Sequence, residues 1–312
     1  MSSNRMHFPN TVHFITNRTE NEMFLLKPTE NITKIIQTWF ARALCKEGQG
    51  LEIYAFIFLS NHFHLLVNDT KGTLAAFMCY FEANVAKAIN RELGRRGSFW
   101  AREYDDVIVD GDEAFWDRYA YTLGNAVKAG LVDKSDEWIG WNSLAGARSD
   151  GEYSFEMLNR TKLHNATRRG QKVDNSKFIE TWSFSLTTPP KHAGMSDAEK
   201  RNHIDSLLES AETEYRALRG NKPPLGVKNV LRQRTTERPR DPSFRQRIKV
   251  FCLDRARREQ LLACYRSFVG GYREIFDVYS KAAAMKSRPI VEWPHGSYPP
   301  SCRYPTWHVS AA

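Results

Sequence analysis

The chain has 312 residues, of which 41% are apolar and 12% aromatic, a composition that suits one large or two modest globular domains and excludes a disordered chain. It has no apolar run of about 18 residues and no apolar segment typical of a secretory signal at its start, so we expect neither a membrane span nor secretion. The five cysteines are scattered and never in CxxC spacing. They therefore indicate a reducing, cytoplasmic compartment and argue against disulfides and thiolate zinc sites.

The net charge of +9 is unevenly distributed. Residues 216–288 hold 19 Lys/Arg and 6 Asp/Glu, whereas residues 1–215 hold 25 Lys/Arg and 29 Asp/Glu. A basic segment of this kind is the electrostatic footprint of a polyanion partner. The alternative is a solvated helix rich in arginine.

The first part of the chain alternates between strand and helix patterns. Thr11–Thr16 is β-branched and apolar and predicts a strand, and Pro28–Cys45 has apolar residues at helical spacing. Two more strands are expected at Leu51–Leu59 and His62–Val67, joined by a turn at Ser60 and Asn61.

The next segments continue this order. Thr73–Leu93 has a helical period, Ser98–Val109 has the bias of one or two strands, and Asp112–Val132 is a helix with acidic residues in its first turn. The resulting β-α-β-β-α-β-α order predicts a ferredoxin-like split βαβ domain of the α+β class over residues 1–145.

The remainder is less regular. Residues 146–195 are polar and weakly periodic, and we expect a linker or an irregular lobe there. Residues 196–312 are expected to form a helical, basic, DNA-binding extension. Within it, a capping box at Ser196 and Glu199 opens a helix to about Arg219, and a second long helix covers roughly Arg245–Ala284, before an extended tail.

His62 and His64 are the first candidate site residues. On a strand, residues i and i+2 project to the same face, so both imidazoles point one way while Phe63 points into the core. Two such histidines can hold one divalent ion and leave most of its coordination sphere open for a substrate phosphate. The simpler alternative is two ordinary half-exposed histidines.

Tyr121 and Asn125 are the second candidate pair. Their i, i+4 spacing places a phenol and an amide oxygen on one helix face, and a tyrosine near a metal can attack an activated phosphate. Alternatively, Tyr121 is an ordinary residue of an amphipathic helix. Three other phenols compete for the same role: Tyr119, Tyr104 and Tyr80.

Together these features resemble a known family. Ser60–Val67 (SNHFHLLV) is similar to the HUH signature (His, hydrophobic, His) of single-tyrosine transposases, and Gly97–Trp100 and Tyr121–Val132 resemble the next two blocks in the same order. The most similar branch is the REP-associated tyrosine transposases. The resemblance covers about residues 10–145, and a weaker one covers residues 225–300.

The resemblance implies roles for individual residues. His62, His64 and Asn125 would be ligands of Mg²⁺ or Mn²⁺, and Tyr121 would be the nucleophile. The sequence departs from the family pattern at Ala126, where proline is usual.

The implied activity is that of a transposase-type endonuclease and strand transferase. It would cleave and rejoin single-stranded DNA at hairpins, through a 5′-phosphotyrosine intermediate, as a monomer or homodimer at the bacterial nucleoid. Arginines would bind the phosphates of the hairpin stem. The candidates are Arg18, Arg232, Arg234, Arg245, Arg247, Arg255, Arg257 and Arg258.

Three other functions remain open. A replication-initiation or relaxase-type nickase would share the chemistry, but it often carries a P-loop, and no GxxxxGK[ST] occurs here. A domesticated, non-catalytic protein could bind DNA hairpins on the same fold. An RNA-binding sheet would need exposed aromatic side chains at Tyr54, Phe56 and Phe58.

Overall fold

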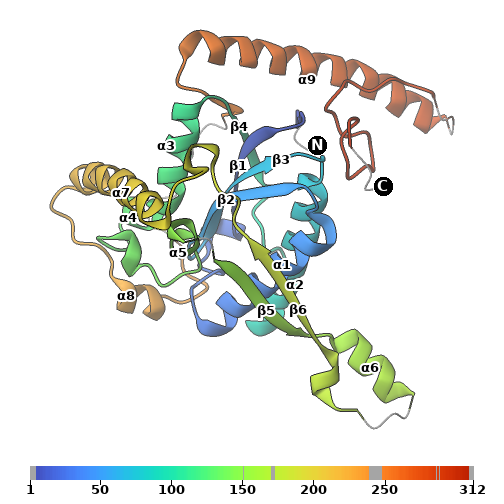
Figure 1. Ribbon diagram of the computed structural model, residues 1–312. Coiled ribbons are helices and arrows are strands. Elements are labelled where there is room, and N and C mark those ends of the chain that lie inside the picture. The colour runs from blue at the N-terminus through green and yellow to red at the C-terminus, as the bar shows by residue number, and fades with distance from the viewer. Residues whose placement is uncertain are drawn as a thin grey trace.

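A five-stranded sheet forms the centre of the molecule in the computed structural model, which describes residues 5–149, 151–169, 173–238, 248–285, 287 and 289–308 (Figure 1). Strands and helices follow one another in the order that the sequence predicts. Up to β4, the strands and α-helices are β1 (Thr11–Arg18), α1 (Glu30–Glu47), β2 (Leu51–Phe58), β3 (His62–Asp69), α2 (Leu74–Glu92) and β4 (Asp105–Val109).

The strand order of the sheet is β2-β3-β1-β4-β7. The first four strands are antiparallel to their neighbours, and the short β7 (Val250–Phe251) is parallel to β4. The β1–β3 register places Thr16 opposite His64 and Arg18 opposite His62. The carboxyl end of β1 therefore lies beside the start of β3.

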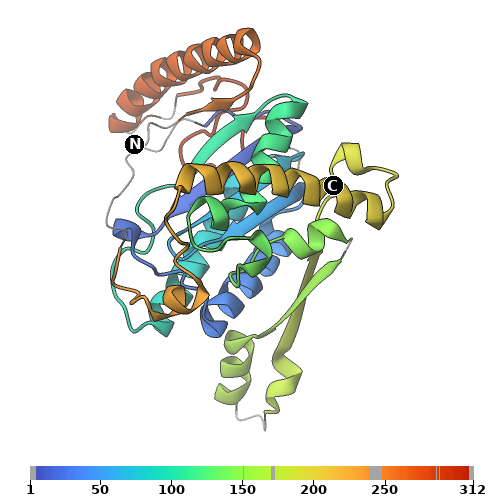
Figure 2. The ribbon, with the colours of Figure 1, turned by 90° about the vertical axis from the view of Figure 1, so that its left-hand side faces the viewer.

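The two faces of the sheet have different covers. Alternate residues such as Ile15 and Phe63 point toward α1 and α2 on one face. Phe14 and Leu66 point to the other face, which is covered by α3 (Asp112–Leu123) and α7 (Asp197–Arg219) (Figure 2). The period of two along each strand produces this division.

The helix predicted over Asp112–Val132 is interrupted. α3 ends at Leu123, and the short α4 (Asn125–Lys128) follows Gly124. A Cβ at Gly124 would lie 3.1 Å from the Ala120 carbonyl oxygen and 3.2 Å from the Tyr215 ring. Glycine therefore allows α7 to pack closely at the break.

The prediction of a linker or irregular lobe over residues 146–195 was wrong. This stretch contains a regular antiparallel hairpin of β5 (Glu152–Leu158) and β6 (Ile179–Ser185), with α6 (Arg160–Arg168) near its tip. We call residues 152–185 the arm, and it projects away from the sheet in both views (Figure 1, Figure 2). The remaining short helices of the described chain before α7 are η1 (Glu20–Glu22), η2 (Ser135–Glu137), α5 (Leu144–Arg148), η3 (Asn175–Phe178) and η4 (Pro190–His192).

The C-terminal part does not form a separate helical extension of the kind expected from the sequence. The capping box at Ser196 and Glu199 is present, but α7 packs its Ile204 and Leu208 into the core beside Phe14. α7 is thus part of the central body. It is followed by α8 (Val227–Arg232).

The last long helix, α9 (Arg255–Ala284), starts ten residues later than predicted. The Asp254 side chain accepts a hydrogen bond from the Arg257 backbone N–H and fixes this start. Residues 239–247, at which the sequence predicts the beginning of the helix, lie outside the described residues. None of the described helices has the length and apolar character needed to cross a membrane.

Candidate active site

His62 and His64 project from β3 onto the face that α3 covers. Their ring centroids are 5.0 Å apart. His64 is buried and its Nδ1 lies 2.7 Å from the Thr16 hydroxyl, across the β1–β3 ladder. His62 lies at the rim, with its Nδ1 2.7 Å from Asn61 Oδ1. A neighbouring strand and a turn residue thus hold the two imidazoles.

Tyr121 and Asn125 reach the same place from the helical layer. The Tyr121 ring centroid is 5.3 Å from that of His64, with the rings nearly perpendicular. Asn125 is buried, and its side chain is hydrogen-bonded with His62. The structure therefore brings together all four residues selected from the sequence, from β3, α3 and α4.

Both histidines are neutral at physiological pH. Burial and the nearby Arg18 lower the pKa of His62 to about 3, against a smaller opposing effect of the hydrogen bond with Asn125. Burial, His62 and the neighbouring cations likewise hold the pKa of His64 well below its usual value. Neutral imidazoles carry the lone pair that a metal needs.

The donor set fits a divalent cation. A neutral His64 with its proton on Nδ1 donates to the Thr16 hydroxyl, so its lone pair lies on Nε2. This Nε2 is buried and has no hydrogen-bond partner among the described residues. Such an atom is unfavourable without a ligand. Two imidazole nitrogens and an amide oxygen suit Mn²⁺, and Mg²⁺ when phosphate oxygens and waters complete the sphere.

Two cations flank the Tyr121 ring. Arg118 Cζ lies 4.5 Å and Lys128 Nζ 4.2 Å from its centroid. The competing Tyr119 is only 1% exposed, within the core, and burial raises its pKa. Tyr121 is thus the phenol that combines partial exposure with a place beside His64.

Arg18, Arg232 and Arg234 lie at the His62 end of the sheet. Arg18 is opposite His62 and pairs with Glu22 at 2.7 Å. The segment that contains the other two is held by Lys27, whose Nζ donates to the carbonyls of residues 231 and 233. The neighbouring Leu26 N–H binds the carbonyl of Ser60, next to the turn before His62.

Arg255, Arg257 and Arg258 lie at the opposite end of the sheet. Arg257 pairs with Asp110 at 3.1 Å, just after β4. Arg255 pairs with Glu259, and Arg258 donates to the Cys252 carbonyl. The structure therefore divides the predicted arginines into two groups, and Arg245 and Arg247 lie outside the described residues.

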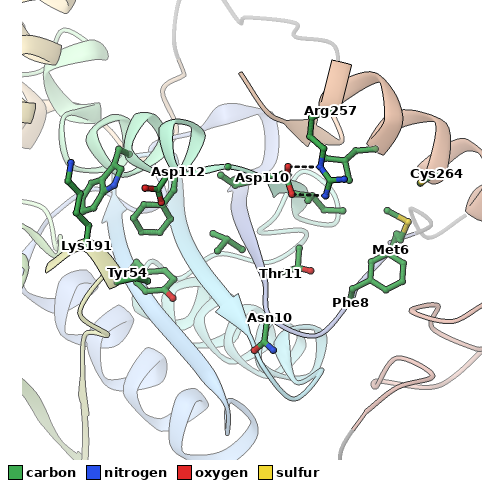
Figure 3. A pocket seen from close by; sticks show the side chains of 18 residues that line it. Met6, Phe8, Asn10, Thr11, Tyr54, Asp110, Asp112, Lys191, Arg257 and Cys264 are labelled. Carbon is green, nitrogen blue, oxygen red and sulfur yellow. Dashed lines mark hydrogen bonds and ion pairs between the residues drawn. The ribbon is translucent and has the colours of Figure 1, made fainter. Parts of the chain in front are cut away.

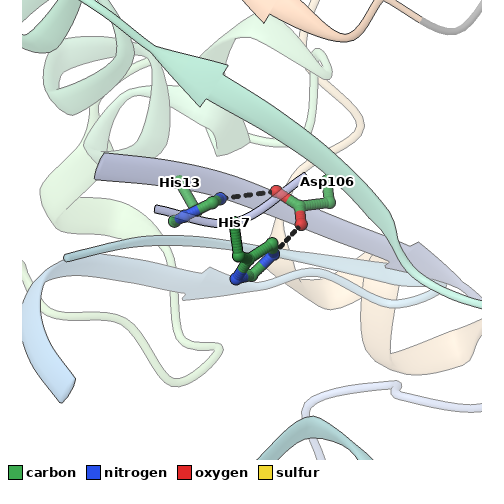
Figure 4. A group of neighbouring side chains, drawn as sticks. All are labelled: His7, His13 and Asp106. Carbon is green, nitrogen blue, oxygen red and sulfur yellow. Dashed lines mark hydrogen bonds and ion pairs between the residues drawn. The ribbon is translucent and has the colours of Figure 1, made fainter. Parts of the chain in front are cut away.

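A second histidine cluster, which the sequence did not reveal, lies on the other face of the sheet. His7 Nε2 and His13 Nδ1 are 2.5 and 2.8 Å from the two oxygens of the buried Asp106 (Figure 4). The three residues offer ligand atoms within 4.8 Å of one another, a spacing that could hold a metal ion. In the sequence, only the presence of two histidines and an aspartate, without a recognisable spacing, pointed to this cluster.

Protons explain the geometry of this second cluster without a metal. Asp106 and Asp69 raise the pKa of His7 to about 9, against the lowering effect of burial. The two imidazoles in turn hold the pKa of Asp106 well below its usual value. We interpret the contacts as hydrogen bonds of a buried ion pair, which a metal could replace only after both bonding nitrogens lose their protons.

A cavity next to α9 is separate from the four candidate residues. It has a volume of about 680 Å³ and lies between α9, the start of α3 and the N-terminal end of β1, where Asn10, Asp110 and Arg257 line it (Figure 3). His62, by contrast, lies at the carboxyl end of β1. None of the four candidate residues lines the cavity.

The aromatic residues of β2 do not form an exposed binding surface. Tyr54, Phe56 and Phe58 are 5%, 0% and 3% exposed. An RNA-binding sheet of the type considered above needs rings available for stacking, so these residues give it no support.

Comparisons with known proteins give weak likenesses. No family model and no curated protein matches the chain. It is similar to the structure of a REP-associated tyrosine transposase bound to a REP hairpin, at 16% identity and a TM-score of 0.39 over 47% of this chain and 85% of that one. It is also similar to a candidate transposase from Deinococcus radiodurans R1, at 15% identity and a TM-score of 0.28 over 35% and 87% of the chains.

Proposed function

We propose that this protein is a metal-dependent strand transferase that cleaves and rejoins single-stranded DNA at hairpins through Tyr121. The observation that carries the proposal is the convergence of His62, His64, Tyr121 and Asn125 around a buried His64 Nε2 without a partner. The strand order supports the further proposal that β1 to β4 form a ferredoxin-like split βαβ core, since each helix joins two strands that flank a third.

His62, His64 and Asn125 would hold Mg²⁺ or Mn²⁺, which when bound would neutralise charge on the scissile phosphate. The Tyr121 phenol loses its proton, and its oxygen forms a bond to phosphorus. The bond to the 3′ oxygen breaks, and that oxygen leaves as a protonated 3′-hydroxyl. The product is a 5′-phosphotyrosine, which another 3′-hydroxyl can attack in reverse to join a new strand.

Arg118 and Lys128 support this chemistry electrostatically. Both place a positive charge within 5 Å of the Tyr121 ring centroid. Positive charge at this position attracts the phosphodiester and stabilises the charge that develops on it. The charge is fixed in place before the DNA binds.

The test is the formation of a covalent adduct. The full chain is incubated with a labelled DNA hairpin that carries single-stranded flanks, with Mn²⁺, with Mg²⁺ or with a chelator. We expect an adduct that survives denaturing electrophoresis only with a metal, and none from Tyr121→Phe, which should still bind the hairpin. Tyr119→Phe is the matched control and should form the adduct.

An undiminished adduct from Tyr121→Phe would assign the nucleophile to another residue. Hairpin binding by the wild type without any adduct, in either metal, would instead support the alternative of a non-catalytic hairpin-binding protein.

A further inference from the structure

The arm is a regular hairpin whose base packs on the body of the protein. Its strands pair in regular register from Glu152 and Ser185 to Leu158 and Ile179. At the base, the rings of Tyr153 and Phe184 stack at 5.0 Å, and Phe184 lies 5.4 Å from Phe40 of α1. This aromatic contact fixes the direction of the arm relative to the sheet.

The tip of the arm is almost all surface. Ala166 is the one buried residue of α6, and Leu163, three residues earlier, is half-buried. The helix packs on η3, at the other side of the same tip. A tip that buries so little apolar area gains little stability from its own core, which points to a role of its exposed surface.

The exposed surface of the tip is basic. Residues 159–169 and 173–178 contain five Lys/Arg and one acidic residue. Lys162 pairs with Glu180 at 2.8 Å. Within the described part of the chain, no ion pair is formed by Arg160, Arg168 or Arg169, and all three are exposed.

Two of these three arginines lie along one side of α6, together with His164. Arg160, His164 and Arg168 follow at i, i+4 and i+8 and form a single exposed stripe. At about 1.5 Å per residue the stripe spans about 12 Å, which is close to the width of about 12 Å of the major groove of B-DNA. Two phosphate strands can thus be contacted by the two ends of one short helix.

We propose that the tip of the arm, with Arg160, Arg168 and Arg169, is a binding site for the phosphate backbone of duplex DNA. A duplex is favoured over a single strand because the stripe has no Phe, Tyr or Trp side chain, the larger rings on which unpaired bases stack. The arm lies outside the basic segment 216–288, so it adds a separate contact. The inference rests on the proposed function in taking the stem of a DNA hairpin as the ligand.

The test compares hairpins whose stems differ in length. Two labelled hairpins share one single-stranded flank and carry stems of about 6 and about 20 base pairs, less and more than the roughly ten of one helical turn. The full chain is compared with the triple variant Arg160→Gln, Arg168→Gln, Arg169→Gln. Lysine at the same three positions is the matched control, because it keeps the charge.

We expect the glutamine variant to bind the long stem about 10-fold more weakly at low salt. The slope of log K against log salt should fall by about two to three, as expected for three lost phosphate contacts. The lysine variant should bind within about 2-fold of the wild type. The short stem should be bound equally by all three proteins, because it does not extend to the arm.

Equal affinity of the wild type and the glutamine variant for the long stem would overturn the proposal. So would an equal loss in the lysine variant, which would show that the charge is not what matters. Adduct formation on an unstructured single strand reports on Tyr121 alone: if it is absent while long-stem binding depends on the arm, only the cleavage proposal fails. If it is present without any effect of the arm, only the arm proposal fails.

Discussion

The Thr16 hydroxyl has a defined position in the candidate site. It lies 2.7 Å from His64 Nδ1 and so fixes the orientation of the ring, and it accepts the Nδ1 proton in the tautomer that leaves Nε2 free for a metal. Hydrogen bonds of this kind to the second nitrogen of a metal-binding histidine raise affinity for the metal. Asn61 Oδ1, 2.7 Å from His62 Nδ1, orients the ring of His62 in the same way.

Thr16→Val should therefore weaken metal binding about 10-fold, at the lower end of such effects, while leaving the fold intact. The reason is that valine has nearly the shape of threonine but no hydrogen-bond acceptor for Nδ1. Isothermal titration with Mn²⁺ measures the change, and Thr16→Ser should restore most of the affinity. Unchanged affinity in the valine variant would show that His64 does not bind the metal.

His7 makes a pH-dependent contribution to stability. Its pKa is raised from 6.5 to about 9 in the folded protein, so its ion pair with Asp106 stabilises in full below about pH 6.5 and is lost as the pH rises through 9. A rise of this size corresponds to about 3 kcal/mol.

We expect His7→Gln to be destabilised at pH 7 by several times as much as at pH 10, in urea unfolding followed by fluorescence. The exposed His164→Gln serves as the control and should show no such difference. If the loss in His7→Gln is the same at both pH values, His7 is not protonated in the folded protein.

Gly124, at the junction of two helices, determines the position of the candidate metal ligand Asn125. It separates α3, which carries Tyr121, from α4, which begins with Asn125. Little space remains beside it, since an added Cβ would lie 3.1 Å from the Ala120 carbonyl and 3.2 Å from Tyr215.

Gly124→Ala should lower the rate of adduct formation by about 10-fold or more, because a displacement of Asn125 by tenths of an ångström misplaces reacting groups. A single-turnover assay with saturating DNA measures this rate. Gly271→Ala on α9, where the nearest atom is 3.8 Å from the added Cβ, should leave it unchanged. A normal rate in Gly124→Ala would mean that the break does not position the site.

The sequence predicted the core elements well because their patterns are local. The strands at Thr11 and Leu51 and the helices after Pro28 and Thr73 have strong periods of two and 3.6 residues, and each appears within a few residues of its expected bounds. The arm was not predicted, although its strands alternate aromatic with polar side chains, because they pair across 20 or more residues and their aromatic side chains are buried only by contact with distant segments such as α1.

The candidate site was predicted in part. The spacing of His62 and His64 places both on one strand face, and that of Tyr121 and Asn125 places both on one helix face. The resemblance to the transposase family implied that the two pairs form one site. Thr16, Arg118 and Lys128 were not predicted, since their places depend on strand register and on the close approach of α3 and α4. Such contacts have no signature in a single sequence.

The arginines divide the whole molecule into two candidate DNA-binding ends. The group at Arg232 and Arg234 lies near His62, and the group on α9 lies beside the 680 Å³ cavity. Asp110 and Glu259 already compensate two of the charges on α9, which reduces the attraction that this end exerts on phosphate.

Two variants test this difference: the double variant Arg232→Gln, Arg234→Gln and the triple variant Arg255→Gln, Arg257→Gln, Arg258→Gln. The double variant should weaken the binding of a short-stem hairpin more than the triple variant does, although the triple variant removes more charge. The salt slope should fall by about two in the first variant and by less than one in the second. Fluorescence anisotropy at several salt concentrations decides this. A larger loss of affinity in the triple variant than in the double variant would place the DNA along α9.

The segment around His7 and the segment from Gly296 to Trp307 meet in one contact. The His7 backbone N–H donates to the Gly296 carbonyl, the Trp307 indole N–H donates to the His7 carbonyl, and Tyr298 lies 3.1 Å from the ring nitrogen that Asp106 leaves free. Only glycine fits at position 296, where φ is +80° and a Cβ would lie 2.3 Å from that same carbonyl oxygen. During synthesis on the ribosome, the segment around His7 therefore reaches its final place late, since the residues that enclose it are made some 290 positions later.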